Sequence, residues 1–198
     1  MKVKAIIFDL DGTITKPCLD FDQIRAEIGI IHGPILEAMA QMPPEQQLRA
    51  NNILIKHELD AAINSRLNPG VHQMLADIRR KNRFIGLVTR NSHDSVNRIC
   101  QIHGLRFDSV ITREDGPVKP DPFAVLQACE IMQVVPQQSI VIGDYLFDLV
   151  SAHRAGAKSI LYCSHPNYAD FQHEADFSIE HFDELNRIIE TIENHNHL

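Results

Sequence analysis

Short apolar runs alternate with helix-compatible stretches along most of this chain. The apolar runs have the length of strands and lie at 3–7, 84–88, 109–112, 139–142 and 159–162. Amphipathic stretches precede each of the last four runs, at 71–82, 92–103, 121–133 and 146–155. Strands that alternate with helices form mainly parallel sheets with right-handed crossovers. The pattern therefore predicts an α/β fold, with a mainly parallel sheet flanked by helices.

The segment 17–68 interrupts this alternation directly after the first strand and the loop that follows it. Residues 21–28 are compatible with a helix, and Pro43-Pro44 begins a longer helical stretch, because proline is tolerated in a first turn. Four apolar residues of that stretch recur at helical spacing and predict its buried face: Leu48, Ile55, Leu59 and Ala62. Asn68-Pro69-Gly70 then ends the insertion.

These boundaries predict a two-part organisation. Residues 1–16 and 69–198 should form an α/β core, and 17–68 a small all-helical cap inserted after the first strand. The stretch 180–192, with apolar residues near helical spacing, should add a final helix to the core.

Two carboxylates follow the first apolar run, in Phe8-Asp9-Leu10-Asp11-Gly12-Thr13. Side chains alternate along a strand, so Asp9 and Asp11 start on the same side. Gly12 lets the backbone turn sharply, because it has no Cβ. Ligands of open parallel sheets bind just outside the carboxyl ends of the strands. The pair is typical of a nucleophile or metal ligand beside a proton donor, although a simple turn would also use these residues.

Three later segments strengthen the functional interpretation. Thr89-Arg90-Asn91 follows the run 84–88, and Gly143-Asp144 follows the run 139–142, with Asp148 four residues on. Lys119 lies between them in a loop bracketed by prolines. Mg²⁺ prefers one or two carboxylates, waters and phosphate oxygens, and ammonium and hydroxyl groups hold the remaining phosphate oxygens. The segments together predict a site for Mg²⁺ and a phosphoryl group.

Composition limits the partners. The chain has 198 residues and a net charge of −7, which argues against a general nucleic-acid or anionic-membrane surface but leaves room for a small anionic substrate. No apolar run approaches the roughly 18 residues of a membrane-spanning helix. The four cysteines are widely spaced, without a C-x-x-C pair, and suit a reducing compartment. We expect a cytoplasmic protein that binds neither nucleic acid nor membrane; the pattern does not specify an oligomeric state.

On these residues the chain resembles the haloacid dehalogenase (HAD) superfamily, on its phosphatase side. All four motifs occur in order: Asp9-Leu10-Asp11-Gly12-Thr13, Thr89, Lys119, and Gly143-Asp144 with Asp148. The resemblance spans residues 3 to about 162 and is greatest to the phosphoglycolate-phosphatase-type group with a helical cap. It implies a Rossmann-like sheet with the first strand central, a Mg²⁺ cofactor and a small phosphorylated metabolite as substrate.

The resemblance also implies catalytic roles. Asp9 would be the nucleophile that forms an aspartyl-phosphate, and also a metal ligand. Asp11 would protonate the leaving oxygen and then deprotonate water, with its backbone carbonyl facing the metal. Lys119 would stabilise transition-state charge, contact substrate oxygens and restrain Asp9.

The remaining motif residues are expected to bind metal and substrate. Asp144 would bind Mg²⁺ directly, and Asp148 would act on it through water or through Lys119. Thr89 would donate its hydroxyl to a phosphoryl oxygen. Arg90 and Asn91 lie in the same loop and are candidate substrate contacts.

We therefore expect a Mg²⁺-dependent phosphatase that acts on a small organic phosphate monoester, with a phosphoglycolate-like substrate suggested by the resemblance. A phosphomutase of the β-phosphoglucomutase type would share all four motifs. A haloacid dehalogenase would need the Asp9 nucleophile but not Asp11 and Asp144. The third alternative is a non-catalytic phosphate-binding module on the same fold.

Overall fold

The computed structural model describes residues 2–194, which group into two compact units. The first, here called the sheet unit, contains the chain up to Lys16, Arg66–Arg90 and the chain from Arg106 onward. The second, here called the helical unit, contains Pro17–Ser65 and Asn91–Leu105.

Six parallel strands form one sheet within residues 2–194, in the order β3-β2-β1-β4-β5-β6. The strands are β1 (Ala5–Phe8), β2 (Phe84–Val88), β3 (Ser109–Ile111), β4 (Ser139–Gly143), β5 (Lys158–Tyr162) and β6 (Phe177–Ile179). β1 is central, with Ile7 aligned to Gly86 of β2 and to Val141 of β4. All four residues of β1 are buried, as expected for a parallel strand covered on both faces. The α/β prediction is confirmed, as is the central first strand.

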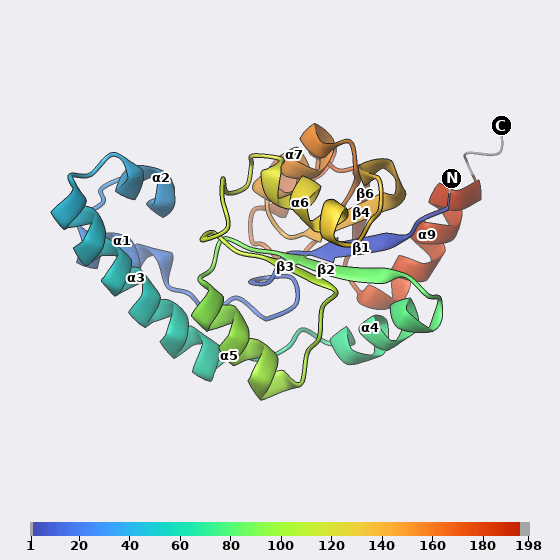
Figure 1. Ribbon diagram of the computed structural model, residues 1–198, viewed down its shortest axis with the longest axis horizontal. Coiled ribbons are helices and arrows are strands. Elements are labelled where there is room, and N and C mark those ends of the chain that lie inside the picture. Colours follow the sequence, from blue (N-terminus) through green and yellow to red (C-terminus); the bar gives the residue numbers. More distant parts are fainter. Residues whose placement is uncertain (1, 195–198) are drawn as a thin grey trace. The chain divides into compact units, whose positions relative to one another are not determined.

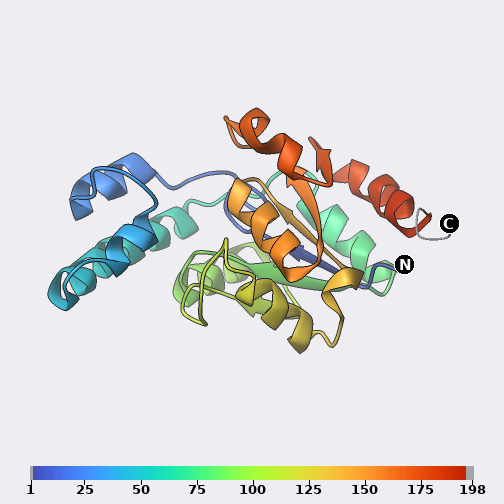
Figure 2. The same cartoon turned by 90° about the horizontal axis from the view of Figure 1, so that it is seen from above.

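Helices cover both faces of the sheet. The sheet unit contains α4 (Val71–Arg80), α6 (Phe123–Ile131), α7 (Leu146–Ala155), α8 (Tyr168–Phe171) and α9 (Leu185–Asn194). α6 and α7 lie on one face, and α4 and α9 on the other (Figure 1; Figure 2 shows the view from above). Small residues of α6 and α7, such as Ala128 and Ala152, share an apolar cluster with Ile7 and Val141 of the sheet. Short 3₁₀ turns occupy Pro136–Gln138, Gln172–Glu174 and Phe182–Glu184.

The helical unit has its own apolar core. It contains α1 (Phe21–Ile28), α2 (Ile35–Ala40), α3 (Pro44–Ile63) and α5 (His93–His103). Ile24 of α1, Met39 of α2 and Leu54 of α3 belong to one buried cluster. The helical insert after β1 is thus confirmed. Among residues 2–194, no helix combines the length and the apolar character that a membrane crossing requires.

The buried face of α3 differs from the predicted one. Its buried residues are Ala50, Leu54, Glu58 and Ala62, one on each turn. Leu48 is 65% exposed, so its assignment to the core was wrong. Ala62 is buried as predicted, and Ile55 and Leu59 are half-buried. The buried stripe combines Leu54 with two alanines and a glutamate, a pattern that apolar periodicity does not detect. β6 was also not predicted, because it has three residues and only Ile179 of them is buried.

Candidate active site

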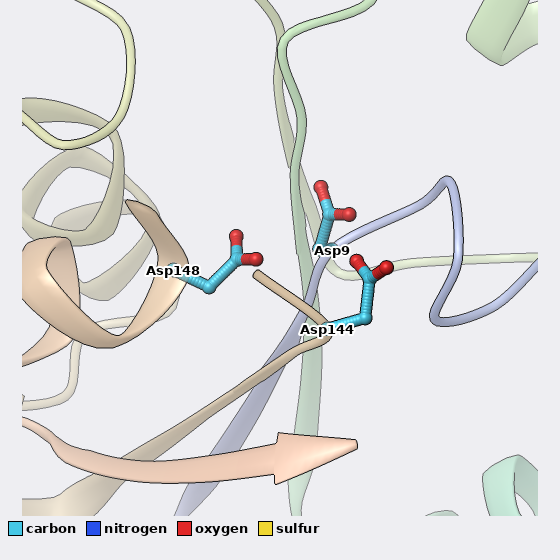
Figure 3. Close-up of side chains that lie close together, drawn as sticks. All are labelled: Asp9, Asp144 and Asp148. Atoms are coloured by element: carbon cyan, nitrogen blue, oxygen red, sulfur yellow. The ribbon is translucent and has the colours of Figure 1, made fainter. Parts of the chain in front are cut away.

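The carboxyl ends of β1 and β4 bring aspartates together. The two strands are parallel neighbours, and Asp9 N donates to Ile142 O at 2.9 Å, one residue beyond β1. Asp144 directly follows β4, and Asp148 lies in the first turn of α7. One oxygen of each carboxylate lies within 4.8 Å of the others, and Figure 3 shows the three side chains gathered around a common space. We call Asp9, Asp144 and Asp148 the acid cluster.

Two glycines allow this close approach. A Cβ on Gly12 would lie 2.1 Å from Asp144 Oδ2, and a Cβ on Gly143 would lie 2.1 Å from Asp148 Cγ. Gly12 also has a φ of +81°, which side chains other than hydrogen rarely allow. At these two positions the carboxylates therefore occupy the space that a side chain would need.

Lys119 is buried against the acid cluster. Its Nζ donates to Asp9 Oδ1 at 2.5 Å, to Asp148 Oδ1 at 2.5 Å and to Val88 O at 3.0 Å. An ammonium group has three donors, so these contacts use all of them. Asp148 Oδ2 in turn accepts from Tyr145 N at 3.1 Å and caps α7. Asp148 is thus both near the other acids and paired with Lys119.

Burial dominates the electrostatics. It raises the pKa of Asp9 to about 7, against the lowering effect of the Lys119 ammonium. Burial and the neighbouring carboxylates of Asp9 and Asp148 raise the pKa of Asp144 to about 9. Burial alone would lower the pKa of Lys119, but Asp148 and Asp9 raise it above its ordinary value. Lys119 is therefore firmly charged, and one ammonium faces three carboxyl groups.

This donor set fits a hard divalent cation. Mg²⁺ binds through one or two carboxylates and retains waters for the remaining positions. The acid cluster offers only carboxylate oxygens. Burial raises the pKa of Asp9 and of Asp144, because the single Lys119 ammonium does not offset the cost of ionising both. Both oxygens of Asp148 accept hydrogen bonds, Oδ1 from Lys119 and Oδ2 from Tyr145 N, whereas Asp9 meets the ammonium through Oδ1. Asp9 and Asp144 are therefore the residues of the cluster that would hold the ion.

Asp11 lies beside the cluster rather than in it. Its side chain is partly exposed, and Thr15 Oγ1 lies 3.3 Å from Asp11 Oδ1 and 3.2 Å from Leu10 O. The group of possible metal-ligand side chains among the described residues contains Asp9, Asp144 and Asp148 but not Asp11. The predicted contact of its backbone carbonyl with metal stays a prediction.

The three residues after β2 have different surroundings. Thr89 is buried, and its backbone N donates to Ile111 O of β3 at 2.9 Å. Arg90 Nη1 donates to Lys119 O, and its guanidinium lies 5.0 Å from the centre of the Phe147 ring. Asn91 is buried and begins the second segment of the helical unit. Sequence analysis did not predict that Arg90 would contact the Lys119 loop.

Sequence analysis also missed two side chains that bind the β1 loop (residues 9–15). Asn68 Nδ2 lies 2.7 Å from Thr13 O and 3.2 Å from both Gly12 O and Thr15 O. Ser164 Oγ donates to Gly12 O at 2.6 Å. Asn68 was interpreted only as part of a turn, and Ser164 follows β5 without a motif around it. No sequence signal identifies a side chain whose partners are backbone carbonyls.

Comparison with known proteins agrees with this geometry. The family model described as haloacid dehalogenase-like hydrolase matches residues 6–162. The chain belongs to this family. It is therefore an enzyme of the HAD-like hydrolase type, as the motifs predicted.

Individual relatives are distant in sequence. The chain is 26% identical to a haloacid dehalogenase-like hydrolase domain-containing protein of Arabidopsis thaliana, over 96% of this chain and 85% of the relative. It is 28% identical to the N-acetylmuramic acid 6-phosphate phosphatase of Pseudomonas putida, over 96% of this chain and 98% of the relative. The structure of a predicted phosphoglycolate phosphatase from Haemophilus somnus has a TM-score of 0.75 at 20% identity, covering 95% of this chain and 98% of that one. The predicted likeness to phosphoglycolate-phosphatase-type structures is confirmed.

Proposed function

We propose that this HAD-like hydrolase is a Mg²⁺-dependent phosphatase that hydrolyses a small organic phosphate monoester through an aspartyl-phosphate on Asp9. The observation that carries the proposal is the placement of the buried Asp9 carboxylate between a fully engaged ammonium, Lys119, and a second acid, Asp144. This arrangement supplies a nucleophile, a fixed positive charge and metal-binding oxygens at one point. The named activity of the Pseudomonas putida relative supports the same class.

The proposed chemistry has two steps. An Asp9 oxygen forms a bond to phosphorus while the bond from phosphorus to the leaving oxygen breaks, and Asp11 gives that oxygen a proton. Asp11 then takes a proton from water as the water oxygen attacks phosphorus, which releases phosphate and restores Asp9. Lys119 keeps Asp9 oriented and offsets the charge that develops on the phosphoryl oxygens.

The remaining roles concern binding. In this proposal the Thr89 hydroxyl donates to a phosphoryl oxygen, and Arg90 and Asn91 contribute further substrate contacts. Asp9, Asp144 and the Asp11 carbonyl would hold Mg²⁺, and Asp148 would act through Lys119 or water. When bound, Mg²⁺ supplies positive charge beside the phosphoryl oxygens.

The proposal is tested by a panel of phosphorylated metabolites assayed with Mg²⁺. Phosphoglycolate and N-acetylmuramic acid 6-phosphate belong in the panel, because relatives carry these names. Release of inorganic phosphate, ranked by kcat/KM, would support the proposal and identify the substrate. Isomerised sugar phosphate without phosphate release, halide release, or no turnover of any compound would each contradict it.

Raised pKa values make the stability of the metal-free protein depend on pH. A carboxyl group whose pKa is higher in the folded than in the unfolded chain stabilises the folded state at low pH, and this contribution is lost as pH rises through the folded value. For Asp9 and Asp144 that window begins near 3.8 and ends at about 7 and about 9. The chelated protein should therefore lose stability as pH rises from 5 to 8.

Mg²⁺ favours the ionised carboxylates and should reverse this loss. We expect the increase in Tm on adding MgCl₂ to be larger at pH 8 than at pH 5, as measured by calorimetry in chelated samples. An equal or smaller increase at pH 8 would mean that Mg²⁺ does not bind to these groups.

We further propose that residues 17–68 act as a substrate-selecting cap on a core formed by 1–16 and 69–198. The segment begins directly after the β1 loop, and a lid hinged at that point could exclude water from the site. Its short length favours compact metabolites. Within the helical unit, Arg25 pairs with Asp22 and His57 contacts Glu27, so these side chains are already oriented.

Substitution of Arg25, His57 or Arg66 in the proposed cap should change the ranking of substrates but not the metal requirement. We expect Arg25→Ala, His57→Ala or Arg66→Ala, at one or more of these positions, to change relative kcat/KM among substrates while Mg²⁺ activation stays the same. Arg49→Ala, at an exposed position on α3, is the matched control. A folded protein whose ranking survives replacement of the whole segment 17–68 by that of a related phosphatase would contradict this role.

A further inference from the structure

We propose that Asn68 and Ser164 are positioning residues that set the geometry of the acid cluster by holding the carbonyl of Gly12. The inference rests on the proposed function, since it concerns how those acids are arranged for the reaction. Both side chains donate to the same oxygen, at 3.2 Å from Asn68 Nδ2 and 2.6 Å from Ser164 Oγ. They come from two separate segments of the sheet unit, Arg66–Arg90 and the chain from Arg106 onward, and neither belongs to the four motifs.

Gly12 is the part of the β1 loop where a small shift has the largest effect. It follows Asp11 directly, and its Cα lies so near Asp144 that a Cβ would be 2.1 Å from Oδ2. A displaced Gly12 would therefore move the backbone of Asp11 on one side and contact the Asp144 carboxylate on the other. Holding its carbonyl fixes two of the proposed functional acids at once.

The backbone around Asn68 is itself well anchored. Asn68 N donates to Ile14 O at 2.9 Å, Lys16 N donates to Arg66 O at 2.8 Å, and Thr15 and Leu67 form an antiparallel bridge. The segment that returns from the helical insert is thus paired with the end of the β1 loop. A rigid backbone gives the amide of Asn68 a fixed direction.

The amide of Asn68 is also used beyond one contact. It is 8% exposed and lies within hydrogen-bonding distance of the carbonyls of Gly12, Thr13 and Thr15. The carbonyl oxygens of these three buried residues all face the Asn68 amide nitrogen, which is a donor. An acceptor in the same place would repel the three carbonyl oxygens. It would also leave them without this donor, and buried polar groups without partners cost free energy.

Asn68→Asp is the sharpest test, because it changes donors to acceptors with almost no change of shape. With p-nitrophenyl phosphate and MgCl₂, we expect kcat to fall about 100-fold, as for a misplacement of about 1 Å, while KM changes little. The Mg²⁺ concentration for half-maximal activity should rise, and the Mg²⁺-induced increase in Tm should shrink. The last readout needs no turnover.

Asn64→Asp is the matched control. Asn64 Nδ2 also donates to a backbone carbonyl, Asp60 O at 2.8 Å, but at the exposed end of α3. It undergoes the same chemical change and should keep the wild-type kcat and Mg²⁺ response. Ser164→Ala, which adds no charge, removes one donor to Gly12 O and should lower kcat roughly tenfold, the equivalent of one hydrogen bond.

The outcomes separate this inference from the proposed function. Wild-type kcat and Mg²⁺ response in folded Asn68→Asp and Ser164→Ala would overturn the inference. If Asn68→Asp does not fold, Ser164→Ala alone decides it. If the wild-type protein hydrolyses no phosphate ester, the proposed function fails, and the Mg²⁺-induced change in Tm of the variants still decides whether Asn68 and Ser164 position the acids.

Discussion

Asp9→Asn should reduce turnover to the detection limit and leave no covalent phosphoenzyme. Asparagine keeps the shape of the side chain, but its amide is not a nucleophile toward phosphorus. The substitution also removes the charge that Lys119 Nζ contacts at 2.5 Å, so the ammonium would be left with Asp148. The measurement combines steady-state phosphate release with mass spectrometry of acid-quenched protein. Asp170→Asn, on the exposed surface of α8, should behave as wild type.

Asp11→Asn should fail differently, because the nucleophile remains. General acid–base catalysis typically contributes about 10²–10⁴-fold, so hydrolysis should slow by that order. With a leaving group that needs little protonation, such as p-nitrophenolate, the first step should survive and phosphoenzyme should accumulate on Asp9. Phosphate attached to any other residue would show that the nucleophile has been assigned wrongly.

The sequence predicted those parts of the fold that have a local pattern of apolar residues. β1 and β4 are buried along their whole length, and β2 and β5 are buried after an exposed first residue. The acids that follow β1 and β4 converge because parallel strands end at the same edge. β6 and the buried stripe of α3 lack such a pattern. Ala50, Glu58 and Ala62 are buried because other residues pack against them. The burial of small or charged residues cannot be predicted from the apolar pattern.

Long-range contacts could be predicted only between residues that belong to a known motif. Lys119 reaches Asp9 across 110 positions, and the resemblance to a family, not the spacing, pointed to it. The contact between α3 and α5 had no such signal. Glu58 Oε2 accepts from Ser92 N at 3.2 Å, and Ser95 Oγ donates to Glu58 O at 3.3 Å, so a buried glutamate joins the two helices in the helical unit. A glutamate in an amphipathic helix usually indicates a solvent-facing position.

Removal of divalent metal should abolish turnover, and Mg²⁺ should restore it. Without a cation, one ammonium faces three buried carboxyl groups, and protons compete for them, as the raised pKa values of Asp9 and Asp144 show. A protonated Asp9 is a poor nucleophile. The metal-free site should therefore lack both an ionised nucleophile and the ion that would position the phosphoryl group. The measurement is phosphate release after exhaustive chelation, followed by titration with MgCl₂. Full activity of the chelated protein would contradict a metal-dependent mechanism.

Asp144→Asn separates the metal ligand from the nucleophile. Asp144 donates to or accepts from neither Lys119 nor the leaving group in the proposed chemistry. Its substitution should therefore act chiefly on metal binding, and the loss of its charge should also make Asp9 easier to ionise. Loss of outer-shell partners typically costs 10–100-fold in metal affinity, and a direct ligand should cost at least about 100-fold in the Mg²⁺ concentration needed for half-maximal rate. Asp121→Asn is the matched control. This exposed acid lies two residues after Lys119, and its side chain accepts a hydrogen bond from Phe123 N. An unchanged Mg²⁺ titration in folded Asp144→Asn would place the metal site elsewhere in the protein.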